Sequence, residues 1–188
     1  MEENSVNPTV KKTRALFLDR DGVINVDKGY VYQFEQFDFV DGIFELLLRF
    51  QKAGYLPVVV TNQSGIARGM YEVSDFKHLM NKVQEVFTSK GIVDVPVYFC
   101  PHHPDQGDGK FTVECQCRKP KAGMFYDAVA ELNIDVENSI MIGDSWRDIV
   151  AAQTASVSKH YFLRGKPIPQ NADMTNVDIV EGLNEIQP

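Results

Sequence analysis

LFLDRDG, residues 16–22, predicts a short buried strand that ends in an acidic turn. The apolar residues form the strand, and Asp19 and Asp21 follow where it ends. Gly22 lets the backbone bend away after the turn. Two acids separated by one residue can also form a solvated turn. A chemical role for the pair can therefore be inferred only together with residues farther along the chain.

The composition indicates one globular domain. The chain has 188 residues, of which 44% are hydrophobic and 24% charged, as in ordinary soluble proteins. No apolar run approaches the ~20 residues of a membrane span, and the first residues do not resemble a signal peptide. We therefore expect a cytoplasmic protein without a membrane partner, with a flexible tail at residues 1–13 and a folded domain at residues 14–188.

The net charge of -7 argues against nucleic acid as the main ligand, because binding a phosphate backbone usually needs a basic face. A small phosphorylated substrate needs only a local cluster of positive charge and a metal ion. Such a substrate therefore remains compatible with an acidic chain.

Apolar and amphipathic segments alternate along the chain. This order is typical of an α/β fold with a doubly wound parallel sheet and right-handed crossovers. An aromatic-rich segment, residues 25–41, interrupts it and predicts a flap or a short hairpin. We expect strands at residues 14–18, 56–60, 95–99, 139–142 and 159–163, helices beginning near residues 42, 74, 123 and 148, and a last strand and short helix within residues 177–186.

Polar side chains follow these strands at their carboxyl ends, where ligands bind in doubly wound sheets. Each of them also has a structural explanation as a helix cap, a surface charge or an acid near a helix N-terminus. Their occurrence at matching strand ends favours a common site. The residues are Asp19, Asp21, Thr61, Asn62, Arg118, Lys119, Asp144 and Asp148.

Three of these acids predict a magnesium site. Asp19, Asp21 and Asp144 can hold Mg²⁺ through oxygen, and Lys119 and Thr61 can bind the phosphoryl oxygens of a substrate. Asp19 would then attack phosphorus to form an aspartyl-phosphate. Asp21 would protonate the leaving oxygen and afterwards activate the hydrolytic water.

The three cysteines lie within one 18-residue window. With a neighbouring histidine they form a set of four ligands suited to structural zinc: Cys100, His102, Cys115 and Cys117. His102 is preferred to His103 as the ligand. A buried thiol or a histidine bonded to backbone would explain single members of the set, but not the Cys-x-Cys pair.

The combined pattern resembles the haloacid dehalogenase superfamily of phosphohydrolases, whose four motifs are matched over nearly the whole chain after the tail. Asp19-Arg-Asp-Gly22, Thr61, Lys119 and Gly143-Asp-x-x-x-Asp148 carry this resemblance. It implies Asp19 as nucleophile, Asp21 as acid and base, Thr61 and Lys119 as phosphoryl stabilisers, and Asp144 as a metal ligand. The spacing leaves no room for a large inserted cap.

The loops carry four further motifs: Asp27-Lys-Gly-Tyr30, Thr61-Asn-Gln-Ser-Gly-Ile-Ala-Arg-Gly69, Cys100-Pro-His-His-Pro104 and Cys115-x-Cys-Arg-Lys-Pro120. These motifs are similar to those of phosphatases that act on the 7-phosphate of D-glycero-D-manno-heptose 1,7-bisphosphate, in the formation of ADP- or GDP-heptose precursors. This resemblance implies a sugar bisphosphate as the ligand. It also implies a set of substrate-binding residues: Asp27, Lys28, Gly29, Tyr30, Asn62, Gln63, Ser64, Arg118 and Ser145. Ser145 departs from the pattern, because Lys or Arg usually follows the metal-binding acid in these enzymes.

Other functions share parts of the pattern. Histidinol-phosphate phosphatases have the same scaffold and zinc loop, but typically a shorter interval between His and the cysteine pair. Receiver domains of signalling proteins also use Asp, Thr and Lys at strand ends, but they are shorter and lack the zinc loop. A zinc-loop interaction module would not need the complete set of acids. We expect a monomeric phosphatase of small sugar phosphates.

Overall fold

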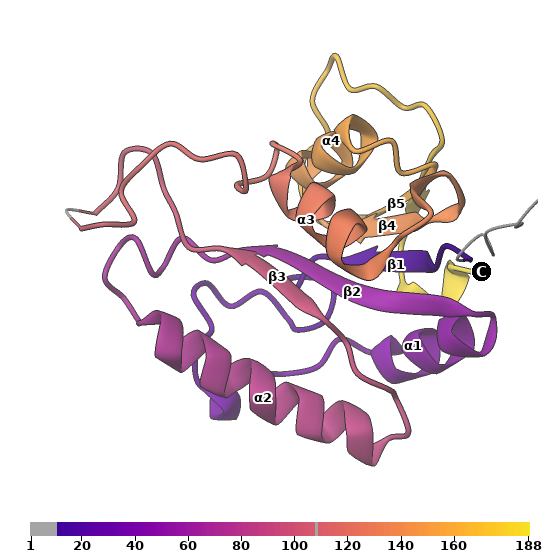
Figure 1. Cartoon of the computed structure of the whole chain (residues 1–188), viewed down its shortest axis with the longest axis horizontal. Helices are drawn as coiled ribbons and strands as arrows, with labels where there is room; N and C mark the ends of the chain where they lie inside the picture. The colour runs from indigo at the N-terminus through magenta and orange to yellow at the C-terminus, as the bar shows by residue number, and fades with distance from the viewer. Residues whose placement is uncertain (1–10, 108) are drawn as a thin grey trace, which may run out of the picture.

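The computed structural model describes residues 11–107 and 109–188, and these residues form a parallel sheet covered by helices (Figure 1). Residues 1–10, most of the predicted tail, lie outside this description. The strands are β1 (Arg14–Leu18), β2 (Tyr55–Asn62), β3 (Val97–Cys100), β4 (Ile140–Gly143), β5 (Lys159–Leu163) and β6 (Val177–Val180), and the helices are α1 (Ile43–Lys52), α2 (Val73–Ser89), α3 (Gly123–Leu132) and α4 (Trp146–Thr154).

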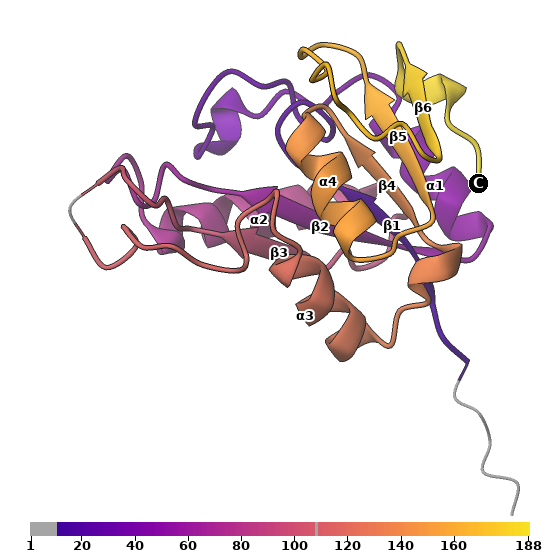
Figure 2. The ribbon, with the colours of Figure 1, turned by 90° about the horizontal axis from the view of Figure 1, so that it is seen from above.

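The six described strands are parallel and stand in the order β3-β2-β1-β4-β5-β6. Figure 2 shows β3 and β6 at opposite edges of this sheet. The chain builds outward from β1 to β3 and then returns to place β4 on the other side of β1. The carboxyl ends of β1 and β4 therefore flank the point where the strand order reverses, and ligands bind at that point in such sheets.

Alternating residues of β1 supply the two halves of the core. Leu16 and Leu18 pack with α1 and α2 on one face, whereas Ala15 and Phe17 pack with α3 and α4 on the other. The two helix pairs lie on opposite sides of the sheet in Figure 1. Because β1 is buried on both faces, its apolar run shows no polar alternation.

The predicted fold class is confirmed, and the differences are local. Thr13 already pairs with Ile134 at the start of β1. The helix expected to begin near residue 74 begins at Val73 and is capped by Glu72, whose side chain and that of Asp75 form a reciprocal capping box. Within the flap, residues 25–41, Asn25 pairs with Phe39, and Phe34–Gln36 form a short 3-10 helix.

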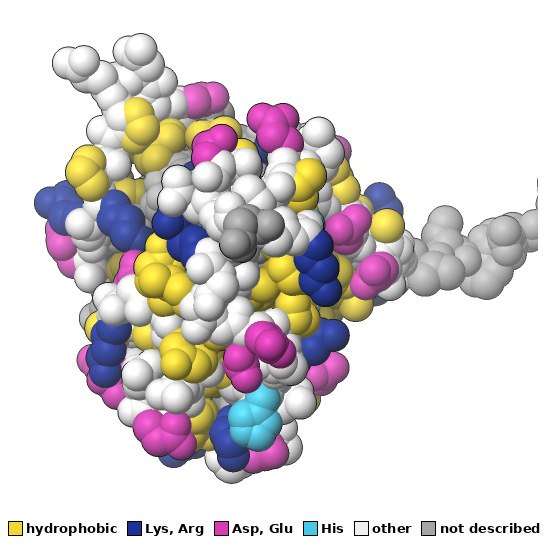
Figure 3. Space-filling model, turned by 90° about the vertical axis from the view of Figure 1, so that its left-hand side faces the viewer, with side chains coloured by type: hydrophobic (Ala, Val, Ile, Leu, Met, Phe, Trp, Pro, Cys, Tyr) yellow, Lys and Arg dark blue, Asp and Glu magenta, His cyan; other side chains and the backbone are white. Residues whose placement is uncertain are grey.

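The described residues contain no inserted cap unit between these elements. None of their helices is long and apolar enough to cross a membrane. Figure 3 faces the side of the molecule at the left of Figure 1, and basic, acidic and apolar side chains are interspersed on it. This mixed face does not present the continuous basic surface that nucleic-acid binding usually requires.

Candidate active site

Three buried carboxylates converge at the carboxyl end of the sheet. Asp19 follows β1, Asp144 follows β4, and Asp148 lies in the first turn of α4; their oxygens lie within 4.8 Å of one another. Gly22 makes this convergence possible, since a Cβ there would lie 2.1 Å from Asp144 Oδ2, and its φ of 89° favours glycine. The acids are therefore held together by the fold.

Lys119 supplies the opposite charge at the centre of the cluster. Its Nζ lies 2.9 Å from Asp19 Oδ1 and 2.7 Å from Asp148 Oδ1, and it donates to the carbonyl of Val60 at 2.7 Å. Burial works against the charge on Lys119, but the two carboxylates outweigh it and hold the pKa above its usual value. Lys119 therefore stays charged beside Asp19.

The side chain of Asn62 positions Lys119 through its backbone. Asn62 Nδ2 donates to the Lys119 carbonyl, and the Lys119 amide donates to Asn62 Oδ1, both at 3.0 Å. This reciprocal pair ties the end of β2 to the loop that carries the lysine. Asn62, predicted as a substrate-binding residue, thus holds the backbone of Lys119.

The surroundings of Asp144 fit a divalent cation. Its Oδ1 is buried and finds no hydrogen-bond partner among the described residues, while Oδ2 lies 2.6 Å from Lys166 Nζ. Burial raises the pKa of Asp144, and the Asp19 carboxylate adds to the rise. A cation with oxygen ligands would satisfy the orphaned oxygen and offset the repulsion between the acids, as Mg²⁺ does in carboxylate sites.

Asp21 lies outside this carboxylate cluster, which differs from the predicted magnesium ligands. Arg20 and Asn25 donate to its Oδ1 at 2.5 Å and 3.1 Å, and Gln63 donates to its Oδ2 at 3.2 Å. These bonds occupy the Asp21 side chain, and Asp148 takes the third place among the acids. The two residues of the opening pair therefore have different surroundings, and their division into nucleophile and acid stays a prediction.

Thr61 is held by a chain of hydrogen bonds that leads away from the acids. Gln63 Nε2 donates to Thr61 Oγ1 at 2.8 Å, and the Tyr71 hydroxyl donates to Gln63 Oε1 at 2.7 Å. Tyr71 in turn stacks on Tyr32 of the flap, with ring centroids 5.2 Å apart. The loop after β2 and the flap thus form one connected wall.

A pocket of about 340 Å³ opens above Asp21. Most of the predicted substrate-binding residues line it. Lys28 instead pairs with Asp38 at 2.5 Å, and Ser145 forms the capping box of α4 with Asp148. The lining residues are Asp21, Asp27, Gly29, Tyr30, Asn62, Gln63, Ser64, Arg68, Tyr71, Arg118 and Arg147.

The cysteine residues and His102 form a compact cluster in the loop between β3 and α3. Neighbouring ligand atoms are 2.9 Å (Cys117–Cys100) to 3.7 Å (Cys100–His102) apart. With metal–sulfur bonds of ~2.3 Å, the edges of a zinc tetrahedron are about 3.8 Å. His103 faces elsewhere and accepts from the amides of Asp105 and Gln106. The cluster is consistent with the predicted structural zinc and with His102 as its histidine.

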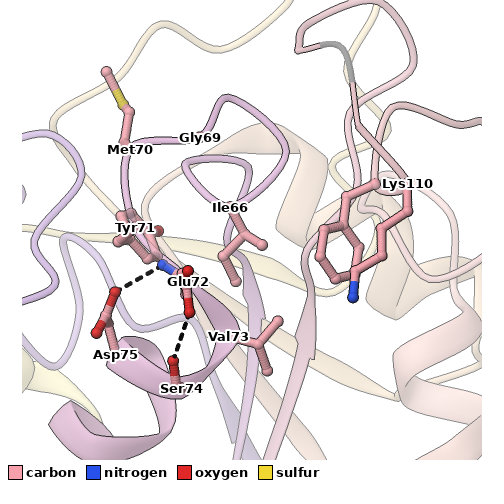
Figure 4. Close-up of a pocket in the computed structure, with 10 residues that line it drawn as sticks. Ile66, Gly69, Met70, Tyr71, Glu72, Val73, Ser74, Asp75 and Lys110 are labelled. Carbon is pink, nitrogen blue, oxygen red and sulfur yellow. Dashed lines mark hydrogen bonds between the residues drawn. The ribbon is translucent and has the colours of Figure 1, made fainter.

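Another pocket, of about 790 Å³, is larger than the one that Asp21 lines. It lies between the start of α2 and Lys110 and Phe111 of the long loop, as Figure 4 shows. Tyr71 lines both pockets and separates them. The close-up also shows Glu72 bonded to Ser74 and Asp75 at the helix start, so the polar groups of this pocket already bind one another.

Comparisons with known proteins agree with this geometry. Residues 116–185 match a family model described as "HAD-hyrolase-like". The chain is 44% identical, over 92% of its length and 93% of the relative's, to a D-glycero-beta-D-manno-heptose-1,7-bisphosphate 7-phosphatase of Vibrio cholerae. The chain belongs to the heptose-1,7-bisphosphate 7-phosphatase family of HAD-like hydrolases.

Two further members support the family assignment. A D-glycero-alpha-D-manno-heptose-1,7-bisphosphate 7-phosphatase of Burkholderia mallei is 49% identical over 78% of this chain and 77% of its own length. The structure of D,D-heptose 1.7-bisphosphate phosphatase from B. bronchiseptica, complexed with magnesium and phosphate, is similar with a TM-score of 0.76 and 28% identity, covering 91% of this chain and 94% of that one. The heptose-1,7-bisphosphate 7-phosphatases thus include members named for both anomers.

Several residues of this family member's site were not found from the sequence. Arg20 is buried and pairs with Asp21, Lys166 bridges Asp144 and Asp27, and Arg147 reaches the pocket from α4. Arg20 lies inside the Asp19-Arg-Asp-Gly22 motif, so its position in the sequence could have indicated that it belongs to the site. Arg147 occupies a variable position of Gly143-Asp-x-x-x-Asp148, and Lys166 lies in a segment without a motif, so only the folded chain shows that both reach the site.

Proposed function

We propose that this protein is a Mg²⁺-dependent phosphatase that removes the 7-phosphate of D-glycero-D-manno-heptose 1,7-bisphosphate. The observation that carries the proposal is the contact of Lys119 with Asp19 beside Asp144, next in the chain to a pocket that Asp21 and Arg118 line. The identity to heptose-1,7-bisphosphate 7-phosphatases over nearly the whole chain supports this substrate.

Asp19 is the nucleophile in this proposal. Its carboxylate attacks the phosphorus of the 7-phosphate, the bond from phosphorus to the sugar oxygen breaks, and Asp21 gives that oxygen its proton. Lys119 binds the phosphoryl oxygens as charge moves onto them, and Thr61, held by Gln63, donates from the other side. The products of this step are the sugar 1-phosphate and an aspartyl-phosphate on Asp19.

Asp21 then acts as a base. It takes a proton from a water molecule that attacks the aspartyl-phosphate, which releases inorganic phosphate and restores the Asp19 carboxylate. Asp19 and Asp144 would hold the metal ion. When bound, Mg²⁺ supplies positive charge that offsets the repulsion between the phosphoryl group and Asp19.

A side-by-side turnover assay tests the substrate. Both anomers of heptose 1,7-bisphosphate, fructose 1,6-bisphosphate and histidinol phosphate are offered with Mg²⁺, and released phosphate is measured. We expect the highest kcat/KM with a heptose bisphosphate, with loss of the 7-phosphate. A preference for histidinol phosphate would overturn the assignment, and a single burst of phosphate without turnover would support a receiver-like role.

The catalytic groups described above all come from one chain, so we propose that the monomer is active. We also propose a cytoplasmic location and a role in the supply of ADP- or GDP-heptose precursors.

A further inference from the structure

Two lysines divide the three buried acids of the carboxylate site between them. Lys119 pairs with Asp19 and Asp148, at 2.9 Å and 2.7 Å, and leaves Asp144 to another cation. That cation is Lys166, whose Nζ lies 2.6 Å from Asp144 Oδ2. The proposed function gives Lys119 a task and gives Lys166 none.

The sheet brings Lys166 to Asp144. β4 and β5 are neighbours, with Gly143 paired to Phe162. Asp144 directly follows β4, and Lys166 lies three residues after the end of β5. Both side chains therefore lie beyond the carboxyl ends of adjacent parallel strands, although they are 22 positions apart in the chain.

The segment that carries Lys166 is fixed on both sides. Before it, the amide of Arg164 donates to the carbonyl at the end of β6 at 2.9 Å. After it, Ile168 packs against the apolar cluster of Trp146 and Phe162. Trp146 lies two residues after Asp144, so the lysine and the acid are anchored to the same group of side chains.

The two oxygens of Asp144 have different surroundings. Oδ2 contacts Lys166 and lies where a Cβ on Gly22 would be 2.1 Å away, so the glycine leaves room for it. Oδ1 is buried and has no hydrogen-bond partner among the described residues. A carboxylate that binds a metal is usually held by further hydrogen bonds that fix its orientation. Lys166 occupies the place of such a partner.

Lys166 approaches Asp144 from outside the carboxylate cluster. Within residues 11–107 and 109–188, the acids that pair with it are Asp144 and Asp27, and neither Asp19 nor Asp148 is among them. Its side chain is 36% exposed, whereas the three acids of the cluster are buried. The ammonium group therefore does not stand between the acids, where a metal ion would bind.

The second contact of Lys166 reaches the flap. Its Nζ lies 3.2 Å from Asp27 Oδ2, and Asp27 Oδ1 accepts from the amide of Gly29 at 3.0 Å. Asp27 and Gly29 both line the pocket above Asp21. A long, partly exposed side chain loses rotamer freedom when it is held, and the second carboxylate restrains Lys166 beside Asp144.

We propose that Lys166 is a positioning residue that holds Asp144 by Oδ2, so that Oδ1 is presented to the metal ion, and that joins the metal site to the flap through Asp27. The inference rests on the magnesium site of the proposed function. It adds to that site a residue that lies outside the sequence motifs and that would touch neither the metal ion nor the reacting phosphate.

Metal binding in the absence of substrate tests this role. Mn²⁺ takes the same oxygen ligands as Mg²⁺, and free Mn²⁺ is measured by electron paramagnetic resonance for the wild type, Asp144→Asn and Lys166→Met. The site that Asp144→Asn removes is the one compared. We expect its Kd to rise about 10-fold in Lys166→Met, as for other partners of metal ligands. Lys166→Arg keeps the charge and the donors and should recover most of the affinity.

Lys159→Met is the matched control. The Lys159 side chain is 33% exposed and pairs with Asp178 at 2.6 Å, as closely as Lys166 pairs with Asp144. Lys159 begins β5 and so lies at the opposite end of the sheet from the carboxylate site. Its substitution removes the same charge and the same kind of ion pair, and the Kd for Mn²⁺ should equal that of the wild type.

Turnover gives a second readout that a general structural defect would not reproduce. Lys166→Met should need about 10-fold more Mg²⁺ for half of its maximal rate, while kcat at saturating Mg²⁺ should stay within about 3-fold of the wild type. A loss of kcat that saturating Mg²⁺ does not restore would contradict a role in positioning a metal ligand.

The binding experiment separates the inference from the proposed function. An equal Kd in Lys166→Met and the wild type would overturn the inference alone. Tighter binding by Lys166→Met would also overturn it, because Lys166 would then compete with the metal ion. A wild type without any Mn²⁺ site that depends on Asp144 would overturn the magnesium site of the proposed function and the inference with it.

Discussion

The carboxylate site and the cysteine cluster are assembled in opposite ways. The carboxylate site (Asp19, Lys119, Asp144 and Asp148) gathers residues from the ends of β1 and β4, from α4 and from the long loop. The cysteine cluster (Cys100, His102, Cys115 and Cys117) lies within 18 consecutive residues at the end of β3. The first depends on the whole sheet, whereas the second lies within one loop and is suited to a metal ion that would hold this loop together.

The two regions meet at Lys119, two residues after Cys117. Cys100 ends β3, so the loop is tied to the sheet at one side and to the Asp19 carboxylate at the other. This arrangement predicts a one-way dependence. Loss of a ligand from the cysteine cluster should displace Lys119 and thereby disturb the carboxylate site. Loss of Asp19 should leave the cysteine cluster intact.

The largest effect is expected for Asp19→Asn. The substitution keeps the size of the side chain but removes the nucleophile, so kcat should fall by at least about 10⁴-fold. Zinc content, measured by atomic absorption, should equal that of the wild type because the cluster does not need Asp19. Asp38→Asn, at an exposed acid of the flap, is the control and should retain activity. Appreciable turnover by Asp19→Asn would exclude the proposed mechanism.

A smaller loss is expected for Lys119→Met. Without the ammonium group, the phosphoryl oxygens lose a donor, and kcat should fall by about 10² to 10³-fold. Asp148 is then buried without its counter-charge, which should lower the free energy of unfolding by about 3 kcal/mol in metal-free urea titrations. Lys121→Met removes an exposed charge from the same loop and should change neither quantity. Wild-type stability of Lys119→Met would show that the ion pair is not needed for the fold.

Adjacent histidines offer a matched test of the cysteine cluster. His102→Ala should release zinc, make residues 100–119 sensitive to protease and lower kcat/KM by on the order of 10-fold, since Lys119 loses its support. His103→Ala should retain zinc and activity because the His103 ring lies outside the cluster and accepts from the backbone amides of Asp105 and Gln106. Full activity of zinc-free His102→Ala would disprove the coupling between the two regions.

The smallest effect concerns acid stability. Burial lowers the pKa of His160 in the folded protein, and its ring nitrogens find no partner among the described residues. Below the unfolded pKa of about 6.5 the unfolded chain binds more protons, so stability present above that pH is lost as the pH falls, by at most about 1.4 kcal/mol per pH unit for this group.

His160→Leu should therefore flatten the loss of stability in urea titrations between pH 7 and pH 5. Protonation of the zinc ligands also destabilises the protein in acid, and that part should persist in the variant. An unchanged pH dependence in His160→Leu would assign the acid sensitivity to other groups, the cysteine cluster first.

The sequence predicted the parts of the molecule that depend on strand order or on spacing. The apolar runs located the strands to within a few residues, and parallel strands carry their carboxyl ends to one edge, so the meeting of Asp19, Lys119 and Asp144 followed from topology. The four ligands of the cysteine cluster were recognisable because they are close in the chain. Strand order and residue spacing can both be read from the sequence without knowing where the side chains point.

The features that the sequence did not predict depend on where side chains point within turns. Asp21 was predicted as a metal ligand, but Arg20, Asn25 and Gln63 hold its oxygens and Asp148 joins the cluster instead. Likewise, Ser145 was predicted to bind substrate but caps α4, and Arg147 lines the pocket two residues later. Spacing alone does not distinguish neighbours in a turn.

The central claim is that Asp19 carries the phosphoryl group during turnover. Rapid acid quenching of the wild-type enzyme with heptose 1,7-bisphosphate and Mg²⁺, followed by peptide mass spectrometry, tests it directly. We expect a phosphorylated peptide with the adduct on Asp19 that forms before free phosphate is released and disappears when substrate is exhausted. Release of phosphate without an adduct, or with an adduct on another residue, would contradict it.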